Sequence, residues 1–433
     1  MGGRYRIFAV QMKSRKIIIF ALVAMFIGWA VAAMSGIMGQ RKLFYAQGKE
    51  ELYDFWMPRM CLEQGYVGHP EKYAGLTFAR DGRPVVIDDI DVLWSDWYTN
   101  GVKTWFITGW RDRVYPLFGI LPLKPFPATR AGGYIWSAFA GIVFLASLCL
   151  IAKSWWPLVF GLSMPFIFNF ERGNTTWLSA AFLGVFLAWW DDEKEWKRMA
   201  AAACLAVAGA MKVTPFAIGA IYFTKWRWRP VLLCGFLSVV FVFVPWFFMQ
   251  DGLAELSAMI KNAAAQSQFM QRASDFGLIQ LWRTARIVAG QHVQEAWPGM
   301  KAVAIISQLI GVSVLVIGTR RRDYLLMAGG MLWAAGNMYY YAMLYLVSVL
   351  VIELSTQETS LCTLRHSTST LKDPEILSLF LWLAILSPLQ LVLLGHSANQ
   401  VIGSVALTGL MTIRLVSGRK KLQVERHGPV EHL

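Results

Sequence analysis

The chain has 433 residues, of which 56% are hydrophobic and only 16% are charged, and it contains 20 tryptophans. This composition excludes an ordinary soluble globular protein, and apolar runs of about 14 to 22 residues predict a polytopic helical membrane protein. The formal charge of +14 does not indicate nucleic-acid binding, because the basic residues form short clusters between apolar runs.

The first apolar run, residues 17–38, follows Lys13, Arg15 and Lys16. A basic segment before an apolar run is also typical of a signal peptide. This run, however, is long and lacks a small-residue cleavage site. We therefore interpret it as a retained anchor that precedes a large outer loop, residues 39–131.

Basic clusters predict the orientation of the chain. Five clusters flank the apolar runs: Arg4 to Lys16, Lys194/Lys197/Arg198, Lys225/Arg227/Arg229, Arg320/Arg321/Arg322 and Arg419/Lys420/Lys421. The positive-inside rule places all five in the cytoplasm. An even number of crossings must then separate successive clusters, and both termini are expected to be cytoplasmic.

This parity predicts that two apolar runs are helical hairpins. Residues 199–223 are expected to turn at Lys212-Val213-Thr214-Pro215, and residues 324–354 at Gly336-Asn337. Proline and an ionisable side chain at membrane depth are tolerated only against a cavity or the protein interior. The turns are therefore predicted to line a cavity at the outer face.

The fold class predicted from these features is an all-α integral membrane bundle of about twelve helices. The predicted runs are 17–38, 132–152, 155–170, 175–190, 199–211, 214–224, 230–249, 300–318, 324–336, 339–354, 376–394 and 397–416. No twofold internal repeat of the kind found in many transporters is present. One large polar loop on one side favours an enzyme over a transporter.

The outer loop is rich in tryptophan, tyrosine and aspartate, with Trp97 at the centre of one such stretch. Aromatic rings next to carboxylates suit sugar rings, whose flat faces stack while their hydroxyls require hydrogen-bond partners. An interfacial aromatic belt has the same composition. Both interpretations of this loop remain open.

No metal or other cofactor is predicted. Asp88, Asp89 and Asp91 offer hard oxygen ligands, but they lack the glycine turn and terminal glutamate of a calcium loop, so a solvated acidic loop is favoured over a divalent-metal site. The histidines are isolated and show no zinc-binding spacing.

Several short motifs occur in a characteristic order: Asp54-Phe55, Tyr115-Pro116-Leu117, Arg172-Gly173-Asn174, Lys212-Val213-Thr214-Pro215 and a late Asn337 followed by aromatic residues. In this order the chain resembles glycosyltransferase family 87, whose members use polyprenyl-phosphate sugars and include mycobacterial mannosyl- and arabinofuranosyltransferases. The similarity extends to about residue 354. It implies a GT-C catalytic module over residues 1–354, followed by residues 355–433 with the last two membrane helices and a basic tail.

The motifs also depart from the family pattern. Pro58 or a neighbour stands where the family has a tyrosine, Leu117 replaces a proline, and the family's Gly-Gln-Asn turn is Gly173-Asn174. Tyr340 occupies the expected place of a histidine. The chain is a divergent member, so its sugar and acceptor cannot be inherited from a relative.

The resemblance implies inverting transfer, which requires a carboxylate base for the acceptor hydroxyl and cations for the leaving phosphate. Asp54 is the candidate base, with an ordinary helix-capping or solvated aspartate as the alternative. Arg172 and Lys212 are the candidate phosphate ligands. The alternatives are a pair between Arg172 and Glu171, and a Lys212 side chain that extends to the lipid headgroups.

The remaining candidates are expected to line the substrate cavity: Tyr115, Asn174, Asn337, Tyr340 and Trp97. Tyr115 with Pro116 either shapes the cavity wall or forms a structural turn. Tyr340 either replaces the family histidine as a hydrogen-bond donor or forms an aromatic helix end.

The predicted function is transfer of a hexose or pentose from a polyprenyl-monophosphate donor to a hydroxyl of an envelope glycan or glycolipid. The expected location is the outer face of a bacterial plasma (inner) membrane. Two alternatives remain open, namely a transporter or flippase of lipid-linked sugars and an inactive scaffold for envelope assembly.

Overall fold

The structure is a computed structural model, and it describes most of the predicted helical segments. The described residues are 19–28, 31, 52, 54–55, 58–59, 62, 77–80, 83–86, 117–127, 129–249, 252–254, 256–257, 259–260, 277–289, 299–335, 340–356, 374–386, 392–393 and 396–426. Most of the outer loop, residues 39–131, lies outside this part of the chain.

The described chain is helical apart from two short antiparallel hairpins. In the hairpins, β1 (Thr77–Arg80) pairs with β2 (Arg83–Val86), and β3 (Val392–Leu393) pairs with β4 (His396–Ser397). Besides a helix over residues 19–28, the helices are α5 (Leu117–Ile120), η2 (Leu121–Leu123), α6 (Arg130–Ala152), η3 (Trp156–Leu162), α7 (Met164–Arg172), α8 (Thr176–Trp189), α9 (Glu195–Met211), η4 (Thr214–Thr224), α10 (Trp228–Phe243), η5 (Val244–Phe248), α12 (Leu278–Val288), α13 (Met300–Arg321), α14 (Tyr324–Ala335), η6 (Tyr340–Met343), α15 (Leu344–Thr356), α16 (Pro374–Leu386) and α17 (Ala398–Arg426).

Local sequence signals explain where α6 and α7 begin and end. The Thr129 hydroxyl accepts a hydrogen bond from the Gly132 N–H at 3.1 Å, which satisfies a donor in the first turn of α6. Lys153 ends α6 in a left-handed conformation with φ 50°. Helix α7 has Pro165 in its first turn and ends at Gly173, where φ is 66°.

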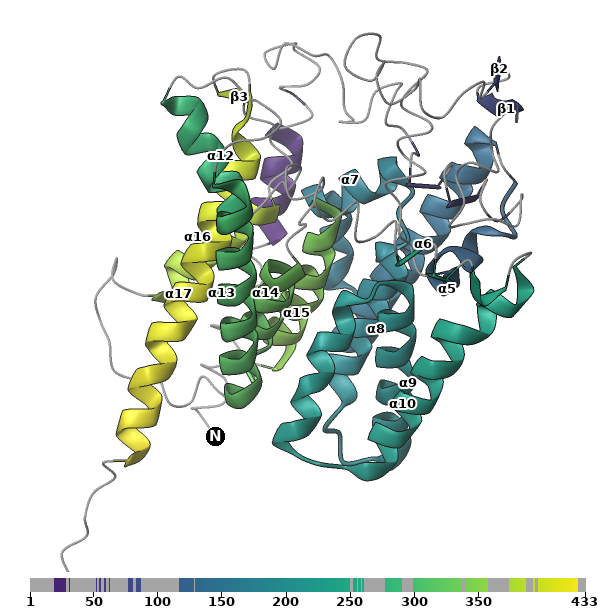
Figure 1. Ribbon diagram of the computed structural model, residues 1–433. Helices are drawn as coiled ribbons and strands as arrows, with labels where there is room; N and C mark the ends of the chain where they lie inside the picture. Colours follow the sequence, from purple (N-terminus) through teal and green to yellow (C-terminus); the bar gives the residue numbers. More distant parts are fainter. Residues whose placement is uncertain are drawn as a thin grey trace, which may run out of the picture.

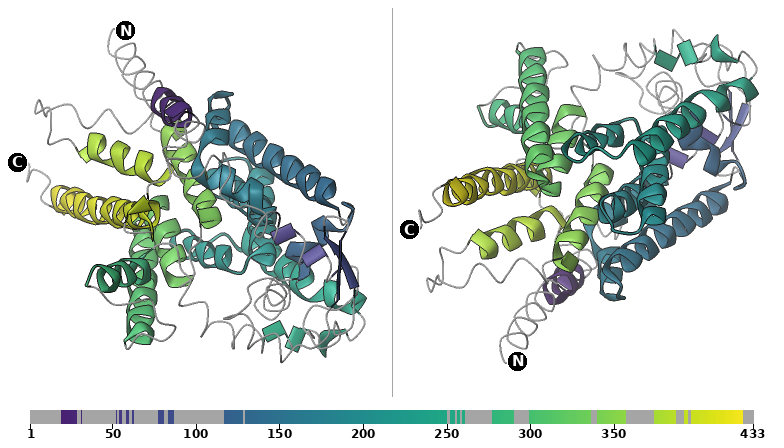
Figure 2. Two further views of the ribbon diagram at one scale, coloured as in Figure 1. Left: turned by 90° about the horizontal axis from the view of Figure 1, so that it is seen from above. Right: turned by 90° about the horizontal axis from the view of Figure 1, so that it is seen from below.

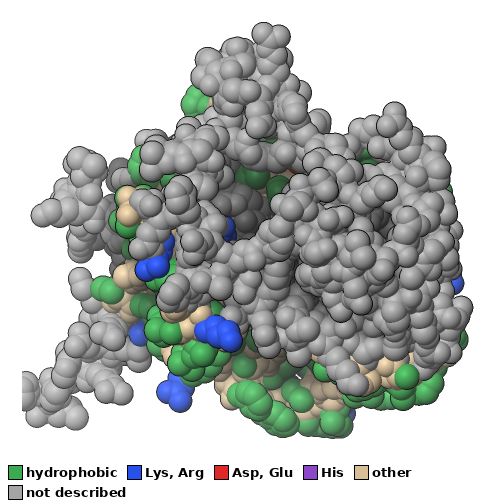
Figure 3. Space-filling model, turned by 45° about the horizontal axis from the view of Figure 1, so that its top comes forward, with side chains coloured by type: hydrophobic (Ala, Val, Ile, Leu, Met, Phe, Trp, Pro, Cys, Tyr) green, Lys and Arg blue, Asp and Glu red, His purple; other side chains and the backbone are tan. Residues whose placement is uncertain are grey.

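Within the described part of the chain, three helices are long and apolar enough to cross a membrane, judged by length and composition: Ala131–Ala152, Trp228–Phe248 and Lys301–Arg321. On α10, Leu232, Phe236 and Val239 share one face, and each is more than half exposed. Where described side chains reach the surface in Figure 3, hydrophobic ones predominate along the lower edge of the view. These exposed apolar faces are suited to contact with lipid.

Helix α8 lies at the centre of one half of the bundle, where it packs against α6, α9 and α15. Figure 2 shows α6 to α10 on one side of the molecule and α13, α14, α16 and α17 on the other, with α15 between them. Gly311 allows helices α13 and α14 to approach closely. A Cβ at this position would clash with the backbone of Trp333 and Ala334. The buried hydrophobic residues form one core cluster with members in both halves, such as Phe144 and Leu187 in one and Met331 and Leu407 in the other.

The two ends of the bundle differ in chemistry. In Figure 1 the α7–α8 turn lies toward the upper end and the α8–α9 turn toward the lower end. At the lower end, Arg227 bonds Asp191, and Arg322 bonds the Thr224 carbonyl oxygen. Three of the basic clusters therefore meet at one end, which is the arrangement that the parity of crossings predicted.

The first predicted hairpin break is found where expected. Helix α9 ends at Met211 and η4 begins at Thr214, so the break falls at Lys212 and Val213. At the second break, α14 ends at Ala335 and η6 begins at Tyr340, while residues 336–339 lie outside the described part. The number of membrane crossings stays a prediction.

Candidate functional site

Asp54 is buried at the upper end of the bundle, with 2% of its surface exposed. Its Oδ2 atom accepts hydrogen bonds from Arg172 Nε at 3.1 Å and from Asn174 Nδ2 at 2.9 Å. A carboxylate at this depth is tolerated when a cation and hydrogen-bond donors compensate its charge. The contacts join Asp54, which the sequence places in a predicted outer loop, to the α7–α8 turn more than a hundred residues away.

The conformation of the α7–α8 turn brings these groups together. Gly173 adopts φ 66°, and a Cβ at this position would lie 2.7 Å from the Cβ of Phe55, the residue next to Asp54. Only glycine combines this backbone conformation with so close an approach. Trp136 Nε1 donates to the Gly173 carbonyl oxygen at 2.9 Å, and the Leu52 N–H donates to the Glu171 carbonyl oxygen at 2.6 Å.

Asn174 is held in an orientation that directs its amide nitrogen at the carboxylate. Its Oδ1 atom accepts hydrogen bonds from the backbone N–H of Thr176 at 2.9 Å and from the Thr176 hydroxyl at 2.7 Å. Because the oxygen is occupied by these two donors, the Nδ2 group is presented to Asp54. The first turn of α8 therefore positions a donor for the buried carboxylate.

Lys212 lies at the break between α9 and η4, where its backbone leaves the helical region with φ −145°. The break is tied to α8 through Ser179, whose hydroxyl donates to the Ala208 carbonyl oxygen at 2.9 Å. The same hydroxyl lies 2.8 Å from the hydroxyl of the buried Tyr345, which also hydrogen-bonds Thr214. These hydrogen bonds hold the break that contains Lys212 next to the first turn of α8, which begins two residues after Asn174.

The structure brings together three of the predicted site residues, Asp54, Arg172 and Asn174, and places Lys212 at the same end. Arg172 contacts Asp54, whereas the sequence suggested the donor phosphate or Glu171 as its partner. Helix α7, which carries Arg172, also packs against η6, which begins at Tyr340. The Arg172 guanidinium also lies 5.8 Å from the centre of the Phe168 ring.

Other predicted residues lie outside the described part of the chain. These are Tyr115, Trp97, Asn337 and the side chain of Tyr340, together with the acidic residues Asp88, Asp89 and Asp91. Sequence reasoning did not identify Trp136, Ser179 and Tyr345. In the sequence, each of these three residues is only a side chain with a polar atom within an apolar helical run. Many residues without a role in a site have the same feature.

The apolar helices define the class of the molecule, an integral membrane protein, and its upper end holds a buried carboxylate with an arginine and an amide. Residues 114–344 match glycosyltransferase family 87, and since this is more than half of the chain, the protein belongs to that family. It is therefore a membrane glycosyltransferase. Neither a curated protein nor a solved structure matches the chain.

The matched range contains Arg172, Asn174 and Lys212, but it begins after Asp54. Asp54 is connected to the matched part by its two hydrogen bonds rather than by the family comparison.

Proposed function

We propose that the protein transfers one sugar from a polyprenyl-monophosphate donor to a hydroxyl group of an envelope glycan or glycolipid, with Asp54 as general base. The observation that carries this proposal is the convergence of Asp54, Arg172 and Asn174 at one end of the helices. Family membership supports sugar transfer, and the buried, oriented carboxylate supports base catalysis at this position.

In the proposed reaction, Asp54 accepts the proton of the acceptor hydroxyl while the oxygen attacks the anomeric carbon of the donor. The bond from that carbon to the phosphate oxygen breaks, and the polyprenyl phosphate leaves from the opposite side. A single displacement of this kind inverts the anomeric configuration. General-base assistance contributes about 10² to 10⁴ in rate.

The geometry favours a changed role for Arg172. Its Nε–H donates to Asp54 Oδ2, so we assign Arg172 and Asn174 to orientation of the base. The leaving phosphate is then assigned to Lys212, an ammonium group at the break where α9 ends and η4 begins. Tyr115, Asn337, Tyr340 and Trp97 stay proposed residues of the substrate cavity.

We place the reaction at the outer face of the plasma membrane, with both termini in the cytoplasm. This orientation rests on the positive-inside rule, and the meeting of three basic clusters at the lower end supports it. Residues 1–354 are proposed to form the catalytic module, and residues 355–433 the C-terminal part.

The test is a transfer assay in nanodiscs with a panel of radiolabelled polyprenyl-phosphate mannose, glucose and arabinofuranose. The wild type is compared with Asp54→Asn and with Asp192→Asn, a control at the lower end. We expect one donor to be used, transfer to be lost only in Asp54→Asn, and that variant still to bind the donor. Transfer by Asp54→Asn at the wild-type rate would contradict the assignment of the base. Binding of a donor without transfer by the wild type would favour a carrier or a scaffold.

A further inference from the structure

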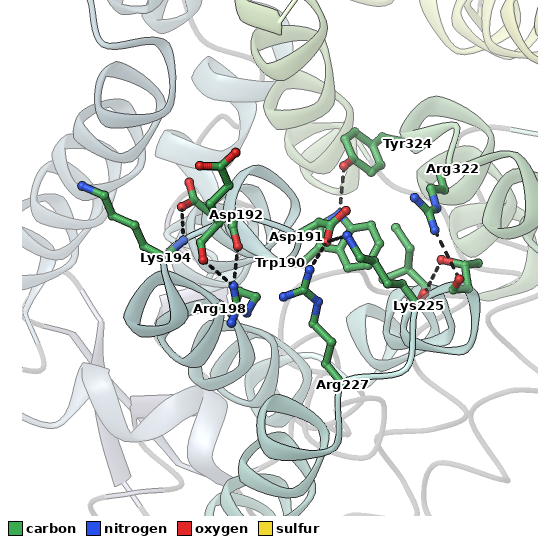
Figure 4. Close-up of polar contacts among 12 residues, drawn as sticks. Trp190, Asp191, Asp192, Lys194, Arg198, Lys225, Arg227, Arg322 and Tyr324 are labelled. Atoms are coloured by element: carbon green, nitrogen blue, oxygen red, sulfur yellow. Dashed lines mark hydrogen bonds and ion pairs between the residues drawn. The ribbon is translucent and has the colours of Figure 1, made fainter.

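A second polar cluster lies at the lower end of the bundle, at the opposite end of α8 from Asp54. Lys225 Nζ lies 2.6 Å from Asp191 Oδ1, and Arg227 Nη2 donates to the same oxygen atom at 2.9 Å. Figure 4 shows both cationic side chains directed at Asp191, with Arg322 and Tyr324 nearby. Lys225, Arg227, Arg322 and Asp191 are termed the lower cluster.

Arg322 is held in the lower cluster by uncharged groups. Its Nη2 atom donates to the Thr224 carbonyl oxygen at 3.2 Å, and its guanidinium lies 5.8 Å from the centre of a Trp190 ring. The Trp190 N–H in turn donates to the Tyr324 hydroxyl at 2.9 Å. Among the described residues, no carboxylate lies within ion-pair distance of Arg322.

The lower cluster therefore contains three cations and one carboxylate, a local surplus of two positive charges. Two neighbouring cations each pair with one carboxylate, Lys197 with Asp192 at 2.7 Å and Arg229 with Glu195 at 2.8 Å, while Arg198 donates to the Asp192 and Glu193 carbonyl oxygens. The Arg227 side chain is 24% exposed, and its buried Nε atom has no hydrogen-bond partner among the described residues. Lys225 and Arg322 are exposed and accessible to a ligand. Like charges held close together favour binding of an anion.

The surroundings of the cluster identify the source of that anion. Phe223, Trp226 and Trp228 flank Lys225 and Arg227 in sequence, and their side chains are 81%, 63% and 57% exposed. The Phe223 and Trp226 rings stack 6.4 Å apart. Exposed tryptophan next to an apolar helix face is typical of the boundary between lipid tails and headgroups. The exposed apolar face of α10 begins directly after these residues.

We propose that the lower cluster binds the phosphate headgroup of an anionic phospholipid in the adjacent leaflet. Arginine offers a planar fork for two phosphate oxygens, and lysine adds a mobile point charge. The flanking aromatic rings contact the part of the acyl chains nearest the headgroup. A soluble phosphate has no acyl chains to make this contact. This site is independent of sugar transfer and lies at the other end of α8 from the proposed base.

The experiment measures retention of short-chain phosphatidylglycerol and phosphatidylcholine by purified protein in detergent, using native mass spectrometry. The Lys225→Gln/Arg322→Gln variant is compared with Arg229→Gln, which removes a cation of a one-to-one pair. A basic residue near a lipid surface contributes about a five-fold change in binding when no carboxylate matches its charge, whereas the charge of Arg229 is matched by Glu195. We therefore expect the double variant to bind phosphatidylglycerol about 25-fold more weakly than the wild type, and Arg229→Gln to bind as the wild type does.

Three results would overturn the proposal. The first is equal retention of the two lipids by the wild type. The second is an equal loss in Arg229→Gln. The third is full displacement of phosphatidylglycerol by millimolar inorganic phosphate, which would assign the cluster to a soluble anion.

Asp191→Asn changes the charge of the lower cluster in the opposite direction from the Lys225→Gln/Arg322→Gln variant. It removes the carboxylate and raises the surplus from two positive charges to three. We expect this variant to unfold at a lower temperature in phosphatidylcholine nanodiscs, and to regain stability when phosphatidylglycerol is added. A folded Asp191→Asn protein that retains less phosphatidylglycerol than the wild type would contradict a headgroup site here.

Discussion

Replacement of Gly173 by alanine tests how the α7–α8 turn positions Asp54. The φ of 66° is unfavourable for alanine by about 1–2 kcal/mol. In addition, the new Cβ would lie 2.7 Å from the Cβ of Phe55, closer than such atoms approach. Because Phe55 adjoins Asp54, relief of this contact must move the carboxylate or the turn that holds Arg172 and Asn174.

The expected result of Gly173→Ala is a modest loss of stability with a large loss of activity. A displacement of about 1 Å at a catalytic group lowers the rate by about 10²-fold. The assays are thermal unfolding and single-turnover sugar transfer, both in nanodiscs. Gly235→Ala is the matched control, since an added Cβ at Gly235 in α10 meets no atom within 4 Å. Wild-type turnover by folded Gly173→Ala would refute the proposed role of the turn.

Three further predictions concern other contacts. Arg172→Gln removes the cation that pairs with the buried Asp54 carboxylate, so we expect destabilisation of about 3–5 kcal/mol in chemical unfolding. Tyr345→Phe removes the hydroxyl that ties the helix break to α8. It should cost about 1 kcal/mol and raise the KM for the donor more than it lowers kcat. The hydrogen bond from Lys197 holds the pKa of Asp192 below its ordinary value. The stability from this pair is therefore present above the ordinary pKa of about 3.9 and is lost as the pH falls through the lowered value, so the unfolding difference between wild type and Asp192→Asn should shrink on acidification.

Each of these predictions has a control or a contradicting result. For Tyr345→Phe the control is Tyr222→Phe, because the buried Tyr222 hydroxyl has no hydrogen-bond partner among the described residues and its loss should leave stability unchanged. Equal effects of the two substitutions would contradict the network. Unchanged stability of Arg172→Gln would show that Asp54 does not depend on this cation. A pH-independent difference for Asp192→Asn would contradict the ion pair.

The sequence predicted the course of the chain through charge and hydropathy. Parity predicted that the run from residue 199 to residue 223 turns, since it has basic residues at both ends, and the proline and ionisable residue at Lys212-Val213-Thr214-Pro215 predicted where it turns. The structure places the break at the same residues and brings the clusters of residues 194–198, 225–229 and 320–322 to one end. These features are local or periodic in the sequence, which explains why they were predictable.

The composition of the site was predicted less completely. Asp54, Arg172 and Asn174 were chosen separately from motifs, and their contact could not be derived, because it depends on the fold over more than a hundred residues. For the same reason the contact between Arg172 and Asp54, on which we base the proposed orienting role of Arg172, was not predicted. Tyr345 illustrates a different limit, since a single hydroxyl in an apolar helix carries no spacing signal that distinguishes a network from an isolated polar atom.

The basic clusters show a third limit of the sequence. They were interpreted only as markers of orientation, and one-to-one pairs cannot be told from surplus charge without the three-dimensional contacts. The structure pairs Arg229 with Glu195 and leaves Lys225 and Arg227 to share Asp191. This unequal pairing is what distinguishes the lower cluster from an ordinary cytoplasmic rim.

The most direct test of the central proposal is the single-turnover rate of sugar transfer by the wild type and by Asp54→Asn, measured at saturating polyprenyl-phosphate donor. Donor affinity is measured in parallel, so that binding and chemistry are separated. If Asp54 is the base, the rate falls by about 10² to 10⁴ while donor affinity is unchanged. A rate within the error of the wild type, or a loss explained by donor affinity alone, would contradict the assignment of Asp54 as the catalytic base.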